Sequence, residues 1–261
     1  EDGSRVHVVL EPVALNGPIL TIRKFPDPIT MDRLLEYGSV TREAADLLKI
    51  LAAARYNIFV SGGTGAGKTT FLNALSEFIP PEERVITIED SAELKLAHIE
   101  NLVRLETRNA NGEGQGAIGI GMLIRAALRM RPDRIVIGEV RGQEAVDLLQ
   151  AMNTGHDGSF CTGHANSCRD MLARLETMVL MGMELPLPAI RSQIASALDV
   201  MVHVARMRNR SRKVTAIEEV VGIENGEIVL RPLFSLDGEG ELRKAGDLRC
   251  QEKLRRAGYG L

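Results

Sequence analysis

Residues 62–70 read GGTGAGKTT, a stretch that fits the pattern G-x-x-x-x-G-K-[ST]. A short aliphatic run, Ile58-Phe59-Val60, comes directly before it, and residues 68–78 read as a helix that ends before Pro80-Pro81. The glycines permit a tight turn with converging N–H groups, and the start of the helix adds a partial positive charge. The stretch therefore predicts a loop that binds phosphate groups.

The residues of this loop have separate expected roles. Lys68 would reach the terminal phosphates of a nucleotide, and the hydroxyl group of Thr69 would ligate Mg²⁺. The other expected nucleotide-binding residues of the loop are Gly63, Thr64, Gly65, Ala66, Gly67 and Thr70. Average residue usage produces such a pattern by chance in roughly one chain in a hundred of this length. The flanking strand and helix make a chance match rarer still, so the stretch predicts a nucleotide site.

Around this loop the chain alternates short aliphatic strands with helices. Strands are expected at 58–60, 85–88, 135–137, 159–163, 200–205 and 214–223, and helices at 41–54, 68–78, 117–130, 142–153, 167–182 and from Pro188 to Leu198. Such strands indicate a largely parallel sheet with helices on both faces, and hence an α/β fold. Asn225-Gly226 predicts a hairpin turn, and a basic helix closes the chain.

Residues 1–26 read as a separate piece. Two strands are expected between residues 5 and 25, with a turn at Asn16-Gly17-Pro18. A lone hairpin is only marginally stable, so we expect this pair to belong to a sheet with further strands upstream. Position 1 is Glu rather than Met, which favours a fragment of a longer protein. A linker that includes Pro26-Asp27-Pro28 and a short helix capped by Thr30 would lead through 27–40 into a main domain at 41–261.

Composition excludes several classes of function. The 261 residues carry a net charge of −3, from 32 basic and 35 acidic residues, and 44% of them are hydrophobic. This balance argues against disorder, against a generic nucleic-acid binder and against a polybasic membrane binder. No stretch approaches the ~18 apolar residues of a transmembrane helix. The three cysteines lack the spacing of a metal site, which favours a reducing compartment.

Acidic residues follow two of the expected strands. Ile86-Thr87-Ile88 leads into Glu89, Asp90 and Glu93, and Ile137 leads into Glu139. Ligands of open α/β sheets lie at the carboxyl ends of the strands, so a carboxylate there could hold Mg²⁺ or orient a water molecule. The alternative is that these acids are merely solvated or cap the next helix.

Histidines and arginines supply further candidates. His156 and His164 flank one short strand, although a single histidine is more often a structural residue. Phosphoryl transfer requires positive charge near the phosphates, and the candidate arginines are Arg5, Arg23, Arg125, Arg129, Arg131 and Arg141. The alternation Arg206, Arg208, Arg210, Arg212 before Lys213 reads as a solvated hairpin end, with an anionic partner as the alternative.

Four blocks of sequence together resemble one family. In chain order they are GGTGAGKTT, TIEDSAEL, RMRPDRIVIGEVRG and NTGHDGSFCTGHANS. The chain resembles the secretion-superfamily ATPases of type II secretion, type IV secretion and type IV pili, most of all the CpaF-type branch of tight-adherence (Flp) pilus assembly. Gly138-Glu139, where an ordinary phosphate-loop ATPase has an Asp, is typical of that family. The resemblance implies a RecA-like domain with a largely parallel sheet, preceded by the C-terminal part of a smaller, PAS-like α+β domain that is mostly absent here.

The resemblance also implies residue roles. Glu93 would orient the attacking water or act as general base, and Glu139 would act near Mg²⁺. His156 and His164 would belong to the family's histidine box, with the firmer role for His164 as a catalytic residue beside Lys68. Arg5 and Arg23 of the N-terminal piece would close over the nucleotide, with Arg141 as a further nucleotide-binding residue.

The resemblance further implies a function. The chain would form a homo-hexameric ring at the inner face of the bacterial cytoplasmic membrane, hydrolyse ATP with Mg²⁺, and work on inner-membrane platform proteins in pilus assembly or protein secretion. No direct contact with nucleic acid is expected. Two alternatives stay open: a DNA-processing or conjugation motor, which the weak net charge disfavours, and a non-hydrolysing assembly module, which the intact Glu93 and Glu139 disfavour.

Overall fold

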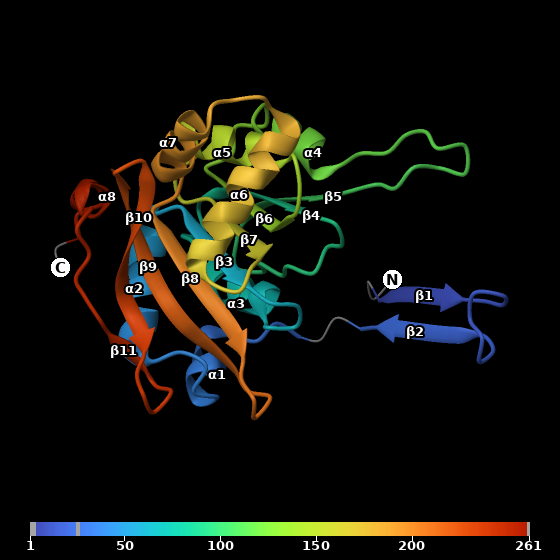
Figure 1. The fold of residues 1–261 in the computed structure, drawn as a ribbon, viewed down its shortest axis with the longest axis horizontal. Helices are drawn as coiled ribbons and strands as arrows, with labels where there is room; N and C mark the ends of the chain where they lie inside the picture. The colour runs from blue at the N-terminus through green and yellow to red at the C-terminus, as the bar shows by residue number, and fades with distance from the viewer. Residues whose placement is uncertain (1–3, 25–26, 260–261) are drawn as a thin grey trace.

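The computed structural model describes residues 4–24 and 27–259, with Arg5 described by its backbone alone (Figure 1). The strands are β1 (Arg5–Val9), β2 (Ile19–Arg23), β3 (Ile58–Gly62), β4 (Arg84–Glu89), β5 (Asn101–Glu106), β6 (Arg134–Val140), β7 (Phe160–His164), β8 (Val200–Arg206), β9 (Arg212–Glu224), β10 (Glu227–Leu236) and β11 (Leu242–Lys244). The helices are α1 (Met31–Glu36), α2 (Arg42–Ala53), α3 (Lys68–Ser76), α4 (Ile120–Ala127), α5 (Ala145–Asn153), α6 (Cys168–Gly182), α7 (Leu187–Ala197) and α8 (Glu252–Arg256).

The main sheet has β3 near its centre. Its nine strands among the described residues run in the order β11-β10-β9-β8-β3-β7-β6-β4-β5. The pairs from β8 to β5 are parallel, and those from β8 to β11 are antiparallel. The α/β fold with a largely parallel sheet is therefore confirmed. The parallel pairing also brings the carboxyl ends of β3, β4, β6 and β7 to one edge of the sheet.

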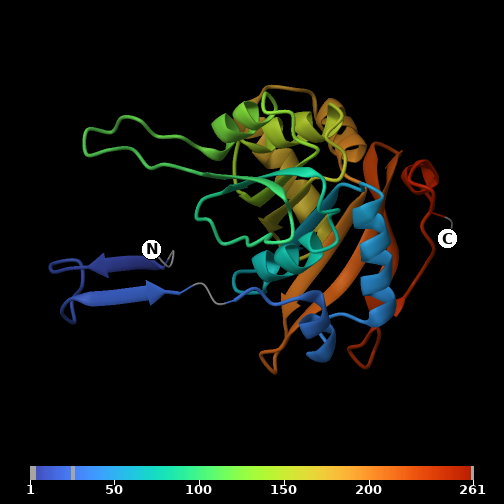
Figure 2. The same cartoon turned by 180° about the vertical axis from the view of Figure 1, so that it is seen from behind.

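Helices cover both faces of this sheet (Figures 1 and 2). On one face, Leu48 of α2 and Leu72 of α3 pack against alternate strand residues such as Val60. On the other face, residues of α4 to α7 pack against the intervening positions, such as Phe59. All five residues of β3 are buried, as expected for a strand covered on both sides. The central strand, and the loop that follows it, are thus held from two sides.

Several boundaries differ from the prediction. Strands β5 and β11 were not predicted, and the helix expected at 117–130 covers only Ile120–Ala127. Pairing between Arg108 and Ile118 keeps the chain before α4 extended. Helix α5 begins at Ala145 rather than at residue 142, because the Glu144 carboxylate accepts the N–H groups of Arg141 and Gly142.

The N-terminal strands β1 and β2 form the expected hairpin. They pair antiparallel, and the register places four apolar side chains on one face: Val6, Val8, Leu20 and Ile22. All four are exposed within the described chain. The larger sheet that we expected for this pair stays a prediction. Pro26 of the expected linker lies outside the described residues, whereas Thr30 caps α1 by accepting the N–H of Arg33.

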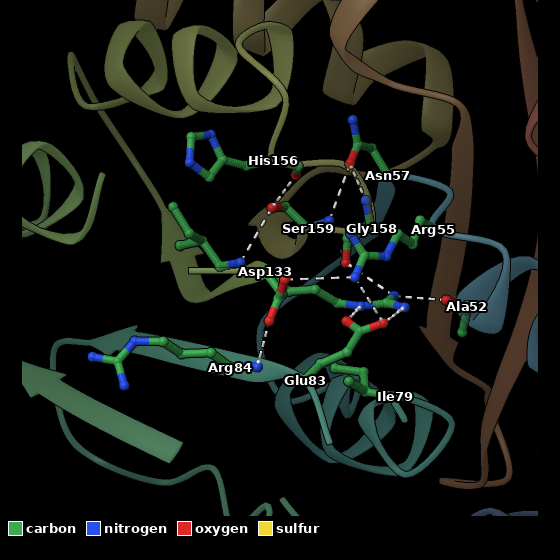
Figure 3. Close-up of polar contacts among 12 residues, drawn as sticks. Ala52, Arg55, Asn57, Ile79, Glu83, Arg84, Asp133, His156, Gly158 and Ser159 are labelled. Carbon is green, nitrogen blue, oxygen red and sulfur yellow. Dashed lines mark hydrogen bonds and ion pairs between the residues drawn. The ribbon is translucent and has the colours of Figure 1, made fainter. Parts of the chain in front are cut away.

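A buried polar network lies at the opposite edge of the sheet from the phosphate loop, where β6 and β7 begin (Figure 3). Arg134 is fully buried, forms a two-point ion pair with Glu83, and donates to the carbonyl oxygen of Ala52 at 2.6 Å. The amide oxygen of Asn57 accepts the N–H groups of Gly158 and Ser159. The network ties the end of α2 to the starts of two central strands.

We expect Arg134→Met to destabilise the fold by about 3–5 kcal/mol, because it leaves the buried Glu83 carboxylate without this guanidinium. Urea unfolding measures the loss. Arg129→Met is the matched control, since Arg129 is exposed, and it should change the free energy of unfolding by less than about 0.5 kcal/mol. Equal losses in the two variants would show that the buried network does not stabilise the fold.

Candidate active site

A cavity of about 730 Å³ opens at the carboxyl edge of the parallel strands. Its lining joins segments that are far apart in the sequence. The predicted site residues that line it are Arg23, Thr64, Gly65, Ala66, Gly67, Lys68, Thr69, Thr70, Glu93, Glu139, Arg141 and His164. The structure therefore brings together the phosphate loop, Glu93, Glu139, His164 and two of the candidate arginines, whereas Arg125, Arg129 and Arg131 are not among the lining residues.

Two glycines explain the shape of the phosphate loop. A Cβ atom at Gly62 would lie 2.3 Å from the carbonyl oxygen of Val204, so the loop strand passes β8 at a distance that only glycine allows. Gly67, at the start of α3, has a φ of +98°, which other residues rarely adopt. The chain can then turn tightly into α3 and present the positive end of the helix to the cavity.

Lys68 lies at the centre of a chain of polar contacts. Its Nζ atom donates to the carbonyl oxygen of Gly63 at 3.3 Å and lies 3.2 Å from Nδ1 of His164. Nε2 of His164 is in turn 2.8 Å from Oε1 of Glu139. Burial lowers the pKa of both Lys68 and His164, and the positive charge of Lys68 adds to the effect on His164. A neutral His164 can accept a hydrogen bond from the Lys68 ammonium at Nδ1, whereas Oε1 of Glu139, although close to Nε2, has no hydrogen-bond partner among the described residues.

Glu139 also pairs with Arg141. The two side chains are 2.9 Å apart, and a second nitrogen of Arg141 lies 3.3 Å from the Asp90 carboxylate. The hydrogen bond from Arg141 to Glu139 raises the pKa of the guanidinium. The side chain of Glu139 thus lies between a histidine and an arginine beside the phosphate loop.

Glu93 is paired with Arg23. A guanidinium nitrogen of Arg23, at the end of β2, lies 3.2 Å from the Glu93 carboxylate. The Glu93 side chain is 20% exposed and that of Arg23 is 61% exposed, so the pair lies at the opening of the cavity. The N-terminal hairpin therefore brings Arg23 to the cavity, while the nucleotide-binding role that the resemblance implies for Arg23 stays a prediction. The side chain of Arg5 lies outside the described atoms.

Glu89 supports Glu93 from below. Only 2% of Glu89 is exposed, and its Oε2 atom accepts the N–H groups of Glu93 and Leu94. Its Oε1 atom has no partner among the described residues. Burial raises the pKa of Glu89 to about 7.

The raised pKa of Glu89 predicts a pH-dependent stability. Between pH 4.5 and about 7 the folded chain keeps a proton that the unfolded chain loses, so the wild type loses stability as pH rises. Glu89→Gln keeps an oxygen acceptor and cannot titrate. We expect its free energy of unfolding, relative to wild type, to rise by up to about 3 kcal/mol across this range. Urea unfolding at several pH values tests this, and a difference that stays constant with pH would contradict it.

The residues present fit a nucleotide with Mg²⁺. Thr69 and Glu139 supply oxygen atoms to the same cavity, and oxygen is the ligand that Mg²⁺ prefers. The described residues contain no group of three or more His, Cys, Asp or Glu side chains that could hold a metal by themselves. This suits a Mg²⁺ ion that is bound through one or two protein oxygens together with substrate phosphates.

His156 does not belong to this site. It precedes β7 whereas His164 ends it, so the two histidines lie at opposite edges of the sheet. Nδ1 of His156 lies 3.2 Å from the carbonyl oxygen of Ala151, and its own carbonyl accepts the hydroxyl of Ser159 (Figure 3). Its role is structural in this structure.

The cavity also contains residues that were not predicted to line it. One end is lined by apolar and polar side chains near α1 and α3: Ile29, Leu34, Tyr37, Ser39 and Phe71. The connection between β8 and β9 adds Arg210 and Ser211, and the start of β9 adds Arg212 and Lys213. The basic run was visible in the sequence, but its place beside the loop depends on the pairing of β8 with β3.

No helix within residues 4–24 and 27–259 is long and apolar enough to cross a membrane.

Comparison with known proteins agrees with the geometry. Residues 2–232 match the family described as type II/IV secretion system protein. A candidate conjugal transfer protein of Mycobacterium tuberculosis is 46% identical over 215 residues, which are 82% of this chain and 60% of that protein. The conjugal transfer protein TrbB of Rhizobium radiobacter is 35% identical over 226 residues, covering 85% of this chain and 65% of TrbB. The chain thus spans about three fifths of the length of these relatives.

A solved structure supports the same fold. The VirB11 ATPase of the Brucella suis type IV secretion system, in complex with sulphate, superposes with a TM-score of 0.61 and 32% sequence identity. The match covers 83% of this chain and 70% of that one.

Proposed function

This chain belongs to the type II/IV secretion system protein family, and from that membership we propose that it hydrolyses ATP to ADP and phosphate in the cavity beside the phosphate loop. One observation carries the proposal: the phosphate loop, Lys68, Glu139 and Glu93 line a single cavity. The combination supplies phosphate binding, a metal ligand and an acid to orient water. The likeness to an ATPase of solved structure supports it.

The residues divide the work as follows. Lys68 and the loop amides bind the phosphates, which requires Lys68 to exchange its contact with Gly63 for phosphate oxygens. Thr69 and Glu139 would hold Mg²⁺, which supplies positive charge against the phosphates when bound. Glu93 orients the attacking water once Arg23 leaves its carboxylate. Arg23 is then free to bind the terminal phosphate. The ion pair between Arg23 and Glu93 is therefore the arrangement before nucleotide binds.

Phosphate release from ATP tests the proposal. The chain should release phosphate with Mg²⁺ and fail to do so with EDTA. A rate per chain that rises with protein concentration would support a ring in which neighbouring copies complete the site. A chain that releases no phosphate at any concentration, under conditions where it is folded, would rule out the activity for these residues.

The finer assignment follows the resemblance. The chain would act as a homo-hexamer at the inner face of the cytoplasmic membrane, on platform proteins of a tight-adherence (Flp) pilus of the CpaF type or of a secretion system. Residues 1–26 would be part of a PAS-like domain, 27–40 a linker, and 41–261 the RecA-like domain. The exposed apolar face of the β1–β2 hairpin supports a further partner for that small domain.

A conjugation motor is the second candidate. Both relatives compared above are described as conjugal transfer proteins, the one from Mycobacterium tuberculosis as a candidate. ATP hydrolysis that DNA stimulates, and that falls steeply with salt, would favour it over a motor that acts on protein alone. The net charge of −3 favours the protein-directed motor.

A further inference from the structure

The basic run that ends at Lys213 has a place in the site that its sequence did not indicate. Strand β8 runs parallel to β3, with Val204 opposite Gly62, so both strands end at the phosphate loop. The turn that follows β8 and the start of β9 therefore lie beside that loop, and residues 210–213 line the nucleotide cavity. The end of the run, residues 210–213, is therefore part of the site, whereas Arg206 and Arg208 are exposed outside it.

Arg212 makes the closest approach to the loop. Its Nε atom donates to the carbonyl oxygen of Gly65 at 3.0 Å. Its side chain also lies across Gly67, where an added Cβ atom would be 3.1 Å from Cδ of Arg212. The arginine thus contacts the loop at two of its glycines, on the part of the backbone that leads into α3.

The charge of Arg212 is not neutralised by a carboxylate. Arg23 and Arg141, the other arginines of the cavity lining outside this turn, both form ion pairs with acids. Within the described part of the chain, no carboxylate oxygen lies within 4.0 Å of the Arg212 guanidinium. Lys213 next to it donates to the carbonyl oxygen of Gly240. Arg212 therefore brings an uncompensated positive charge to a cavity built for phosphates.

We infer that Arg212 is a positioning residue for the phosphate loop, through which the start of β9 holds the loop ready for a nucleotide. A carbonyl oxygen of Gly65 that is bound from outside leaves the loop N–H groups free to point into the cavity. This inference rests on the proposed nucleotide site. It adds a residue from outside the four family blocks.

Arg212 should affect the binding of ADP and the binding of ATP alike. The contact is with the backbone of the loop, which ADP and ATP would share, and not with a group that recognises the terminal phosphate. Loss of Arg212 should therefore weaken both nucleotides to the same extent. It should raise KM for ATP and leave kcat nearly unchanged, because no reacting atom loses a contact.

Equilibrium binding of ADP and of a non-hydrolysable ATP analogue tests it in three variants. Arg212→Ala should bind both about 5- to 30-fold more weakly, with their ratio unchanged. Arg212→Lys keeps the charge but has no donor at the Nε position, so it should stay weaker than wild type. Arg208→Ala removes the same charge from the same basic run at an exposed residue outside the cavity lining, and should bind as wild type does.

Each result that differs from these expected affinities leads to a different conclusion. Unchanged affinity in Arg212→Ala, full recovery in Arg212→Lys, or equal loss in Arg208→Ala would overturn the inference and leave the nucleotide site standing. A loss confined to the ATP analogue would also overturn it, by making Arg212 a contact of the terminal phosphate. A wild-type chain that binds neither nucleotide would overturn the proposed function as well. Equal melting temperatures of the unliganded variants exclude a general loss of fold.

Discussion

Glu139→Gln should lower the rate of ATP hydrolysis about 10²- to 10⁴-fold while ATP binding stays within a few-fold of wild type. Glutamine has the same shape, and its amide oxygen can still accept from Arg141, so the cavity keeps its form. What it loses is the negative charge beside the metal site and the ability to accept a proton. Phosphate release gives the rate, and binding of a fluorescent ATP analogue gives the affinity.

The matched control for this variant is Glu106→Gln. Glu106 is exposed at the end of β5, on the same edge of the sheet, and does not line the cavity. It should hydrolyse ATP as the wild type does. If Glu139→Gln were to keep full activity, Glu139 would have no part in hydrolysis, and Glu93 alone would remain as the acid of the site.

Lys68→Ala has the second large expected effect, on binding itself. Lys68 is only 7% exposed, and its ammonium group donates to the carbonyl oxygen of Gly63 within the same loop. Its removal should weaken ADP and ATP binding by about 30- to 1,000-fold, the range for truncation of a buried charged partner. Calorimetry measures the change.

Lys68→Ala should do little to the stability of the unliganded chain. Burial lowers the pKa of Lys68, which means that the charged ammonium group destabilises the folded state. Lys49→Ala, an exposed lysine of α2, is the control for charge and should change neither binding nor stability. Wild-type affinity in Lys68→Ala would place the nucleotide away from this loop.

The sequence alone could predict the phosphate loop because the strand, loop and helix that form it are neighbours in the chain. A strand of five residues, a glycine loop and a helix follow each other without a gap, so the loop's position needs no long-range information. Glu139 could be placed for a similar reason. It stands near the end of an aliphatic strand, and parallel strands bring their carboxyl ends to one edge.

Other parts of the site depend on contacts between distant segments. The pair of Arg23 and Glu93 joins residues 70 positions apart, and Arg212 is 147 positions from Gly65. Neither separation leaves a periodic signal in the sequence. Strand β5 was missed because its edge position leaves it partly exposed, so that polar residues interrupt its apolar pattern.

The positions of His156 and His164 could be predicted from the strand between them. Family resemblance grouped His156 with His164, yet the expected strand at 159–163 already separated them. A strand of that length carries its two ends to opposite edges of a sheet, about 17 Å apart at the usual rise per residue. Local geometry in this case was the better guide to which histidine lines the cavity.

The most direct test of the account is to measure ATP occupancy and phosphate release on the same samples of wild type and Glu139→Gln with Mg²⁺ present. The account predicts comparable occupancy in the two proteins, phosphate release by the wild type, and almost none by the variant. Absence of bound ATP in the wild type, or equal release by both proteins, would contradict it.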